Sequence, residues 1–426
     1  MTDRPVILDV TGGAAGVAAS YAAARALADA FDEAGDRLRG WGTGGLRAMR
    51  DPDLLESGLL SPGSCAEAEE ALMAAAAGPR GAIAASLGWE ADAMAVRAAI
   101  SYLEETDRAV SVAVTGADRR LASLEVAGLA SVVALGGPDA LTDHPDLLSH
   151  TVTGLGGSLG ALALSTLYGD PGRPVVRPYG VTVPGSDRQP ESVRELLGQL
   201  REVAALSGSP DSPANGTIEV QTILGPDEKV RHIVYLPGTD EFEAPWDQDR
   251  DVRDLQTNLQ LVGGWQDAYQ QGILQAMDDA GVRPGQPVLL VGHSQGGMAA
   301  AALLAGDHAG ADVTDVVTAG SPTAQVPGFP AGAHVLSLEQ HGDVVPQLDG
   351  APNPDSVEQT TVVFDARPGD GVLAHHDYEV YEQGAGLTDT TSDPSVSEAV
   401  QSLHAHGFLG HGGQVTSQVF QITRAP

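Results

Sequence analysis

The sequence predicts an α/β fold, in which a mostly parallel sheet is flanked by helices, preceded by an all-α region. From about residue 13 to 118, apolar residues recur at helical spacing. After residue 175, short strand-like runs alternate with helical segments, which is typical of α/β layers. A Gly- and Pro-rich run at 169–174 separates the two patterns. Because 426 residues exceed the size at which one core stops growing, we expect two domains, at 1–170 and 175–426.

The N-terminal domain is predicted to be a bundle of Ala-rich helices. Its first helix carries an apolar stripe at alternating steps of four and three, and we expect it to end at Gly40–Gly45. A second helix is expected to begin at a capping box of Ser64 and Glu67 and to stop at Gly78. A third helix also has one apolar face. The two stripes consist of Val17, Tyr21, Ala24, Ala28, Phe31, Gly35 and Leu38, and of Trp89, Ala93, Val96, Ile100 and Leu103.

Further apolar segments follow at 120–168. The uncharged run at 151–168 is rich in Gly, Ser and Thr, so we interpret it as a buried or lid helix rather than a membrane span. The runs at 124–135 and 151–167 need an apolar partner, either the second domain or another protein. The helical domain is therefore expected to cap the functional site or to bind a partner protein, and both alternatives stay open.

Strands and helices alternate through the second domain. The strand-like runs are rich in Val, Ile and Leu, and the helical segments are amphipathic. A helix at 395–403 is expected to close the domain. The expected strands are 175–183, 217–224, 232–236, 288–291, 313–319, 334–338 and 360–364, and the expected helices between them include 191–206 and 265–280.

The strand at 288–291 runs into a G-x-S-x-G sequence, Gly292-His293-Ser294-Gln295-Gly296, and then into an Ala-rich helix. A strand, a sharp turn flanked by glycines and a helix together form the context of a nucleophile elbow. Ser294 is therefore the candidate nucleophile. The backbone N–H of Gln295, at the start of the helix, is the candidate donor to an oxyanion.

Candidate partners of Ser294 follow two later strands. Asp343 comes after the strand at 334–338, and His376 follows the last strand. The chain order Ser, acid, His is that of an α/β-hydrolase fold, in which the histidine takes the serine proton and the acid fixes the histidine tautomer. We choose His376 as the base, and its neighbour His375 stays the alternative.

These motifs resemble those of class 3 lipases. The sequence at 292–297 is similar to their G-H-S-L-G-G, the one at 319–322 to their F-G-x-P, and the one at 343–346 to their D-x-V-P. His376, with Tyr381 five residues later, resembles the histidine and aromatic of actinobacterial PE-PPE-type serine hydrolases. The resemblance covers the second domain alone, and it implies an α/β-hydrolase fold and ester hydrolysis.

The same resemblance implies a second oxyanion donor. Pro237-Gly238-Thr239 stands where class 3 lipases have R-G-T or R-G-S, so Thr239 would supply its N–H, with its hydroxyl as a further candidate donor. Pro237 replaces the arginine of those lipases, which leaves open what that arginine would hold in place. Trp246 and Asp249 resemble the W-x-x-D that follows this turn, and we interpret them as structural.

The composition restricts the partners. The 57 acidic and 23 basic residues give a formal charge of −34, so binding to nucleic acid or to an anionic bilayer by charge is not expected. A single cysteine, Cys65, excludes an intramolecular disulfide and a cysteine-based metal site. The adjacent residues His375, His376 and Asp377 are not expected to hold an ion, because neighbours in sequence seldom face one metal. We expect neither a metal nor a cofactor.

The localisation is open between two alternatives. The first residues contain acids where a signal peptide needs basic and then apolar residues, so no Sec signal is expected. The helical domain resembles the hairpins of WXG-type proteins that leave actinobacteria by type VII secretion. The sequence departs from that pattern, because Trp41-Gly42-Thr43-Gly44 lacks the W-x-G order. A cytoplasmic location and a type VII-like export route both remain.

The sequence therefore favours a serine carboxylester hydrolase that acts on lipid or other acyl esters through Ser294, Asp343 and His376, by way of an acyl-enzyme. One alternative is an acyltransferase with the same three residues. Another is a secreted or surface interaction protein whose helical domain binds a partner.

Overall fold

The structure of the chain is a computed structural model. It describes residues 4–113, 172–207, 212–240, 250–262, 266–306, 308, 310–324, 326, 328–348, 352–367 and 372–425.

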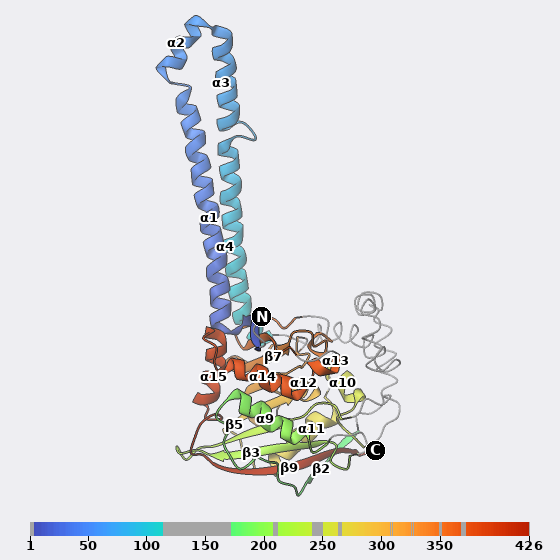
Figure 1. Cartoon of the computed structure of the whole chain (residues 1–426). Helices are drawn as coiled ribbons and strands as arrows, with labels where there is room; N and C mark the ends of the chain where they lie inside the picture. The colour runs from blue at the N-terminus through green and yellow to red at the C-terminus, as the bar shows by residue number, and fades with distance from the viewer. Residues whose placement is uncertain are drawn as a thin grey trace. The chain divides into compact units, whose positions relative to one another are not determined.

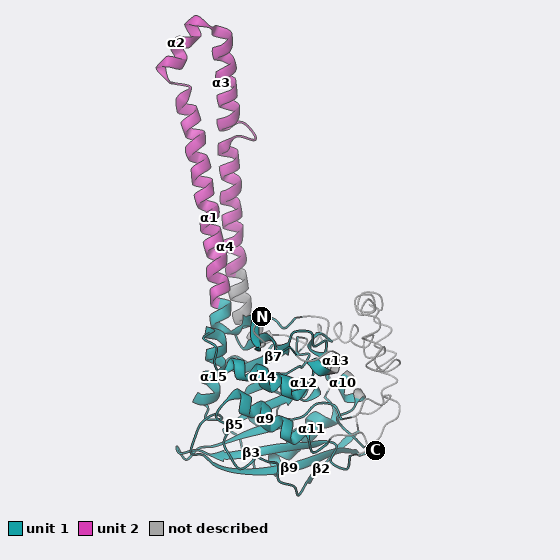
Figure 2. Ribbon diagram, in the orientation of Figure 1, with its two compact units in different colours: residues 1–17, 111–426 teal, residues 18–110 magenta. Residues whose placement is uncertain are grey.

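The chain forms two compact units, which Figure 2 shows in different colours. One comprises residues 18–110, and the other comprises residues 1–17 and 111–426. The domain boundary that the sequence predicts at 170–175 stays a prediction, because residues 114–171 lie outside the described part. The predicted apolar segments between 120 and 168, with the lid helix among them, fall in that same stretch.

The helical unit consists of long antiparallel helices joined by shorter ones (Figure 1). The centres of the predicted stripes are buried between the long helices: Ala28 and Ala93 are inaccessible to solvent, and the rings of Phe31 and the partly exposed Trp89 meet edge to face at 5.1 Å. These contacts join residues far apart in sequence, so an apolar seam holds the helices together. The helices are α1 (Gly13–Ala48), α2 (Pro52–Leu60), α3 (Pro62–Ala77) and α4 (Ala82–Ala113).

The predicted break at Gly40–Gly45 is wrong, because α1 continues to Ala48. Gly42 is buried on the seam, where a Cβ atom would lie 2.6 Å from Cγ1 of Ile83. The glycine therefore serves close approach of two helices rather than helix termination.

The predicted capping box of Ser64 and Glu67 is also wrong. The helix α3 begins two residues earlier, at Pro62, whose fixed φ suits the first turn of a helix. Its predicted end at Gly78 is confirmed. The short helix α2 is not among the predicted elements.

Nine strands of the described residues form one sheet, in the order β1-β8-β7-β6-β5-β4-β3-β9-β2. The strands from β4 to β8 run parallel, and the pairs outside them are antiparallel. All seven predicted strands are present, with ends that differ by a few residues. The strands are β1 (Val6–Gly12), β2 (Arg173–Pro178), β3 (Thr217–Leu224), β4 (Val230–Leu236), β5 (Pro287–His293), β6 (Asp312–Ala319), β7 (His334–Gln340), β8 (Gln359–Asp365) and β9 (Gln414–Ala425).

The outer strands β1 and β9 are not among the predicted elements. In β9, polar residues such as Thr416 and Gln418 alternate with apolar ones, as in an antiparallel strand with one exposed face. The helix predicted at 395–403 therefore does not close the domain, because β9 follows it and inserts between β3 and β2. In β1, at the edge of the sheet, apolar residues are exposed. Its sequence therefore lacks the regular alternation of buried apolar and exposed polar residues that predicts a strand.

Helices cover both faces of the sheet (Figure 1). Alternate residues of β4 point to opposite faces: Val234 and Leu236 join one apolar cluster, while Ile233 and Tyr235 join the other. The first face is covered by α11 (Ala268–Asp279) and α12 (Gln295–Ala305), against which α10 (Leu255–Val262) packs. The second face is covered by α9 (Val193–Ala204), α14 (Tyr378–Thr388) and α15 (Pro394–Ala405).

This three-layer arrangement, with a mostly parallel centre, is consistent with the predicted α/β-hydrolase fold, and the N-terminal helical region lies in the chain between β1 and the other strands of the sheet. Among the helices of the described residues, none has both the length and the apolarity that a membrane crossing requires.

Candidate active site

Ser294 lies on the sharp turn between β5 and α12. Its φ is 53° and its ψ is −121°, a combination that costs a residue with a side chain conformational strain. Its N–H donates to the carbonyl of Ala319 at 2.9 Å, which anchors the turn to the end of β6. A Cβ atom on Gly296 would lie 2.6 Å from the carbonyl oxygen of Pro237. The glycines of the G-x-S-x-G sequence thus allow the close packing that a nucleophile elbow needs.

Gln295 is the first residue of α12, and its side chain is buried. Backbone N–H groups in the first turn of a helix have no acceptor within the helix, so the N–H of Gln295 suits an anion beside Ser294. The side-chain amide donates to the carbonyl of Asp254 at 2.8 Å. The side chain therefore anchors the turn, and the backbone is left for chemistry.

The turn that contains Thr239 follows β4 and packs against Ser294. A Cβ atom on Gly238 would lie 3.1 Å from the Cβ of Ser294, so this position has little room for a larger residue. The hydroxyl of Thr239 accepts a hydrogen bond from the Asn258 amide at 3.0 Å. That bond uses a lone pair of the hydroxyl and leaves its O–H free to donate, so the backbone N–H and the hydroxyl of Thr239 are both candidate oxyanion donors. Trp246 and Asp249 lie outside the described residues.

Asp343 and His376 are in direct contact. Nδ1 of His376 donates to Oδ2 of Asp343 at 2.7 Å, and the carboxylate side chain is fully buried. Two further donors meet this carboxylate, the phenol of Tyr381 at 2.6 Å and the N–H of Val345 at 3.0 Å. Three donors thus fix the position of this buried carboxylate.

His375, the alternative base, points elsewhere. Its Nδ1 donates to the carbonyl of His341 at 3.2 Å, in an exposed setting. Of the two neighbouring histidines, only His376 contacts Asp343.

His376 is held by the end of β6 and by His293, the residue before Ser294. A Cβ atom on Gly320 would lie 2.9 Å from Cε1 of His376, and Gly320 directly follows the residue that anchors Ser294. Nε2 of His293 donates to the carbonyl of His376 at 3.0 Å, and the two rings are 4.4 Å apart. Since His293 immediately precedes Ser294, these contacts place the histidine beside the elbow.

Burial sets the protonation of the neighbouring rings. It lowers the pKa of His293 well below 6.5, and His376 lowers that pKa further, so His293 is neutral. Burial, together with the charge of Asp343, raises the pKa of Tyr381 well above 10, so this phenol stays a donor. Burial also raises the pKa of Tyr378 to about 12.

Sequence reasoning missed several residues of this site. Tyr381 enters it only through the resemblance, as an aromatic without a role, and His293 only as a letter of the elbow motif. Tyr378 and Arg253 are not among the predicted site residues, because they contact Gly238 from segments that lie far from it in the sequence and share no motif with it. Among the described residues, no three His, Cys, Asp or Glu side chains gather as a metal site would require.

One comparison with known proteins gives a match. A family model described as PGAP1-like alpha/beta domain, a family of the α/β-hydrolase type, matches residues 252–400. The matched stretch includes Ser294, Gln295, Asp343 and His376, and it begins after Thr239. No curated protein and no solved structure matches the chain.

Proposed function

We propose that the chain is a serine carboxylester hydrolase that works through an acyl-enzyme. The observation that carries this proposal is the contact at 2.7 Å between the buried Asp343 and the partly buried His376, held beside a strained elbow that presents Ser294. This is the set of groups that covalent acyl transfer needs: a nucleophile, a base and a group that orients the base.

In the first half-reaction, Oγ of Ser294 attacks the ester carbonyl carbon while Nε2 of His376 takes the hydroxyl proton. The carbonyl oxygen becomes an oxyanion, which accepts hydrogen bonds from the N–H groups of Gln295 and Thr239. The C–O bond then breaks, and the imidazolium returns the proton to the leaving alcohol. In the second half-reaction, water attacks the acyl-enzyme with the same base, and the acid product leaves.

The hydrogen bonds around the pair support this division of roles. A carboxylate on Nδ1 fixes the tautomer whose Nε2 is the proton acceptor. His293 does not compete as a base, because its Nε2 carries a proton that it donates to the His376 carbonyl.

Transfer of the acyl group to an alcohol other than water would use the same acyl-enzyme, so an acyltransferase is the second candidate function. The resemblance to class 3 lipases favours esters over amides and acyl or lipid esters as substrates. The interaction-protein alternative is less well supported, because a chain without catalysis has no need of a strained serine beside a histidine paired with a buried aspartate.

A labelling experiment tests the proposal. A fluorophosphonate probe should label the chain, and the label should map to Ser294. p-Nitrophenyl esters of graded chain length should compete with the probe, and their ranking would report the acyl preference. Labelling of Ser294→Ala at the rate of the parent chain, or no ester turnover by pure, folded protein, would refute the esterase.

A further inference from the structure

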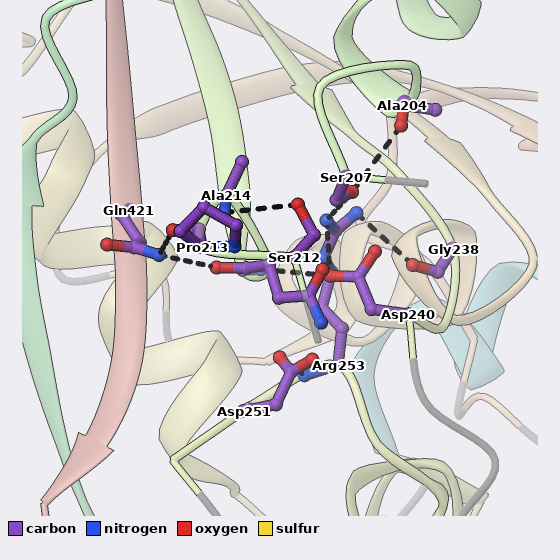
Figure 3. Close-up of polar contacts among 12 residues, drawn as sticks. Ala204, Ser207, Ser212, Pro213, Ala214, Gly238, Asp240, Asp251, Arg253 and Gln421 are labelled. Carbon is purple, nitrogen blue, oxygen red and sulfur yellow. Dashed lines mark hydrogen bonds and ion pairs between the residues drawn. The ribbon is translucent and has the colours of Figure 1, made fainter. Parts of the chain in front are cut away.

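Arg253 is a fully buried cation close to the elbow, in the segment between the Thr239 turn and α10. Its guanidinium makes three contacts (Figure 3): Nη1 donates to the carbonyl of Gly238 at 3.2 Å, and Nη2 contacts Ser207 Oγ at 2.8 Å and Asp240 Oδ2 at 2.5 Å. The backbone adds a further link, because the N–H of Asp240 donates to the carbonyl of Arg253 at 2.8 Å.

A buried arginine is costly unless its charge is compensated and its donors are used. Here Asp240, whose side chain is 7% exposed, balances the charge. That carboxylate in turn accepts from the N–H of Gly216 at 2.9 Å, which ties it to the start of β3. Arg253 and Asp240 thus form a buried charge pair under the Thr239 turn. Burial alone would disfavour both charges.

The contact with Gly238 reaches the proposed oxyanion hole through one peptide bond. The Gly238 carbonyl and the Thr239 N–H belong to the same planar peptide unit, and no cis peptide occurs among the described residues. In a trans unit the C=O and N–H point in opposite directions. A guanidinium that fixes the direction of the carbonyl therefore also fixes the direction of the N–H.

The preceding peptide unit is held as well. The N–H of Gly238 donates to the phenol oxygen of Tyr378 at 2.8 Å. A glycine is conformationally free, and a Cβ atom here would crowd Ser294, so no side chain at this position can restrict the turn. Arg253 and Tyr378 restrict it from outside, each through one of the two peptide units that flank Gly238.

We infer that Arg253 is a positioning residue for catalysis, which aims and polarises the Thr239 N–H as an oxyanion donor by binding the carbonyl of the same peptide unit. The inference rests on the proposed serine hydrolase function. It explains how the turn is held in this chain, in which Pro237 replaces the arginine of class 3 lipases. A positive charge on the carbonyl side makes the N–H a stronger donor, and a fixed N–H needs no reorganisation when the oxyanion forms.

The test is a double variant, Arg253→Met with Asp240→Asn, which removes the guanidinium together with the charge of the carboxylate in contact with it. The amide oxygen at position 240 would still accept from Gly216. We expect kcat for a p-nitrophenyl ester to fall on the order of 10- to 100-fold, somewhat less than removal of a whole donor costs. KM should change by less than about 3-fold, because the ground-state ester makes weaker use of the hole.

A trifluoromethyl ketone provides a second readout. It adds to the serine and forms a tetrahedral oxyanion, so its inhibition constant should rise in parallel with the loss in kcat. A purely structural role would lower the amount of folded protein without this parallel. The variant Arg253→Lys keeps the charge but not the forked geometry, and it should give an intermediate kcat.

Arg231 offers a matched control. It is also a buried arginine, paired with Asp227 at 2.8 Å, but it lies at the start of β4, whereas the Thr239 turn follows the end of that strand. Arg231→Met with Asp227→Asn should lower the unfolding temperature and leave kcat and the inhibition constant unchanged.

Two results would overturn the inference, and they are distinguishable. If the parent chain turns over esters and the folded Arg253 double variant keeps kcat and the inhibition constant within about 2-fold, Arg253 does not position the hole. If the parent chain itself neither turns over esters nor reacts with the fluorophosphonate at Ser294, the proposed function fails, and the role of Arg253 fails with it.

Discussion

The α/β unit carries two buried aspartates that each bind a histidine, and their contact distances are nearly the same. Asp343 accepts from His376 at 2.7 Å, and Asp315 accepts from His406 at 2.6 Å. Both carboxylates are inaccessible to solvent.

The two regions differ in where the serine is connected. Ser402, on the regular helix α15, donates its hydroxyl to Asp315 itself at 2.7 Å. Oγ of Ser402 also lies 3.4 Å from Nδ1 of His406, but this nitrogen donates its proton to Asp315 and therefore cannot accept the proton of the serine. Ser294 sits instead on a strained turn, and its side chain makes no hydrogen bond that caps α12.

The histidines differ as well. The hydrogen bond with Asp315 raises the pKa of His406, so this ring holds its proton more tightly than an isolated imidazole does. Contact among an aspartate, a histidine and a serine is therefore not sufficient for catalysis. The order of the connections, and a backbone that presents the serine, decide the difference.

The largest expected effect separates the two serines. Ser294→Ala should lower ester turnover on the order of 10³-fold or more, because it removes the covalent route. Ser402→Ala should leave kcat unchanged and reduce the free energy of unfolding by about 1 kcal/mol, the usual value of a buried hydrogen bond. Kinetics and thermal unfolding of both variants measure this. More than a tenth of the parent activity in Ser294→Ala would remove the basis of the comparison.

The histidines should divide in the same way. His376→Ala should match the loss of Ser294→Ala, since the two act as a unit. His375→Ala and His406→Ala should keep kcat, because neither contacts Asp343 in the structure. A steady-state assay of the three variants decides it. If His375→Ala were the inactive one, the base would be reassigned to that residue and the mechanism would stand.

A smaller loss is expected at the acids. Asp343→Asn should reduce kcat on the order of 10²- to 10³-fold, because the amide favours the wrong tautomer of His376 and leaves the base itself in place. Asp315→Asn should affect unfolding and not kcat. Comparison of kcat with the unfolding temperature for each variant separates the two roles. A silent Asp343→Asn would show that the pair at 2.7 Å does not serve catalysis.

The smallest expected effect is a pH dependence of stability from His406. Its pKa is raised in the folded chain, so the folded state binds the proton more tightly than the unfolded state does. The stabilisation is fully present below the unfolded pKa, about 6.5, and is lost as the pH rises through the folded value. Unfolding temperatures of the parent chain and of His406→Gln should therefore converge with rising pH. A gap that widened with pH would contradict the pairing.

The sequence predicts the centre of the fold better than its edges. The strand at Thr217–Leu224 and the passage from β5 to α12 follow from buried apolar runs and a glycine turn. The edge strand β1 and the partly exposed β9 escape detection, since few of their residues are buried in a continuous run. Gly42 led to the opposite error, the prediction of a break where the helix continues. A glycine can end a helix, but it can also allow two helices to pack closely.

The candidate site divides along similar lines. Ser294, Asp343 and His376 stand in motifs whose chain order carries information. The supports of the site, Arg253 under the turn and Tyr378 on Gly238, depend on which distant segments the fold brings together. A charged residue in a loop gives no sign in the sequence that it will be fully buried.

The strand β9 has a consequence for how the chain becomes folded. This strand pairs with both β3 and β2, which do not pair with each other. The antiparallel side of the sheet that β3, β9 and β2 form therefore cannot assemble until β9 has been synthesised. At the other edge of the sheet, β1 cannot pair until β8 has been synthesised, because Val6 lies opposite Asp365. Contacts so distant in sequence make folding slow and leave the earlier strands exposed on a ribosome-bound chain. The parallel centre, which is contiguous in sequence from β4 to β8, is the part that can form first, and it carries Ser294, Asp343 and the last strand before His376.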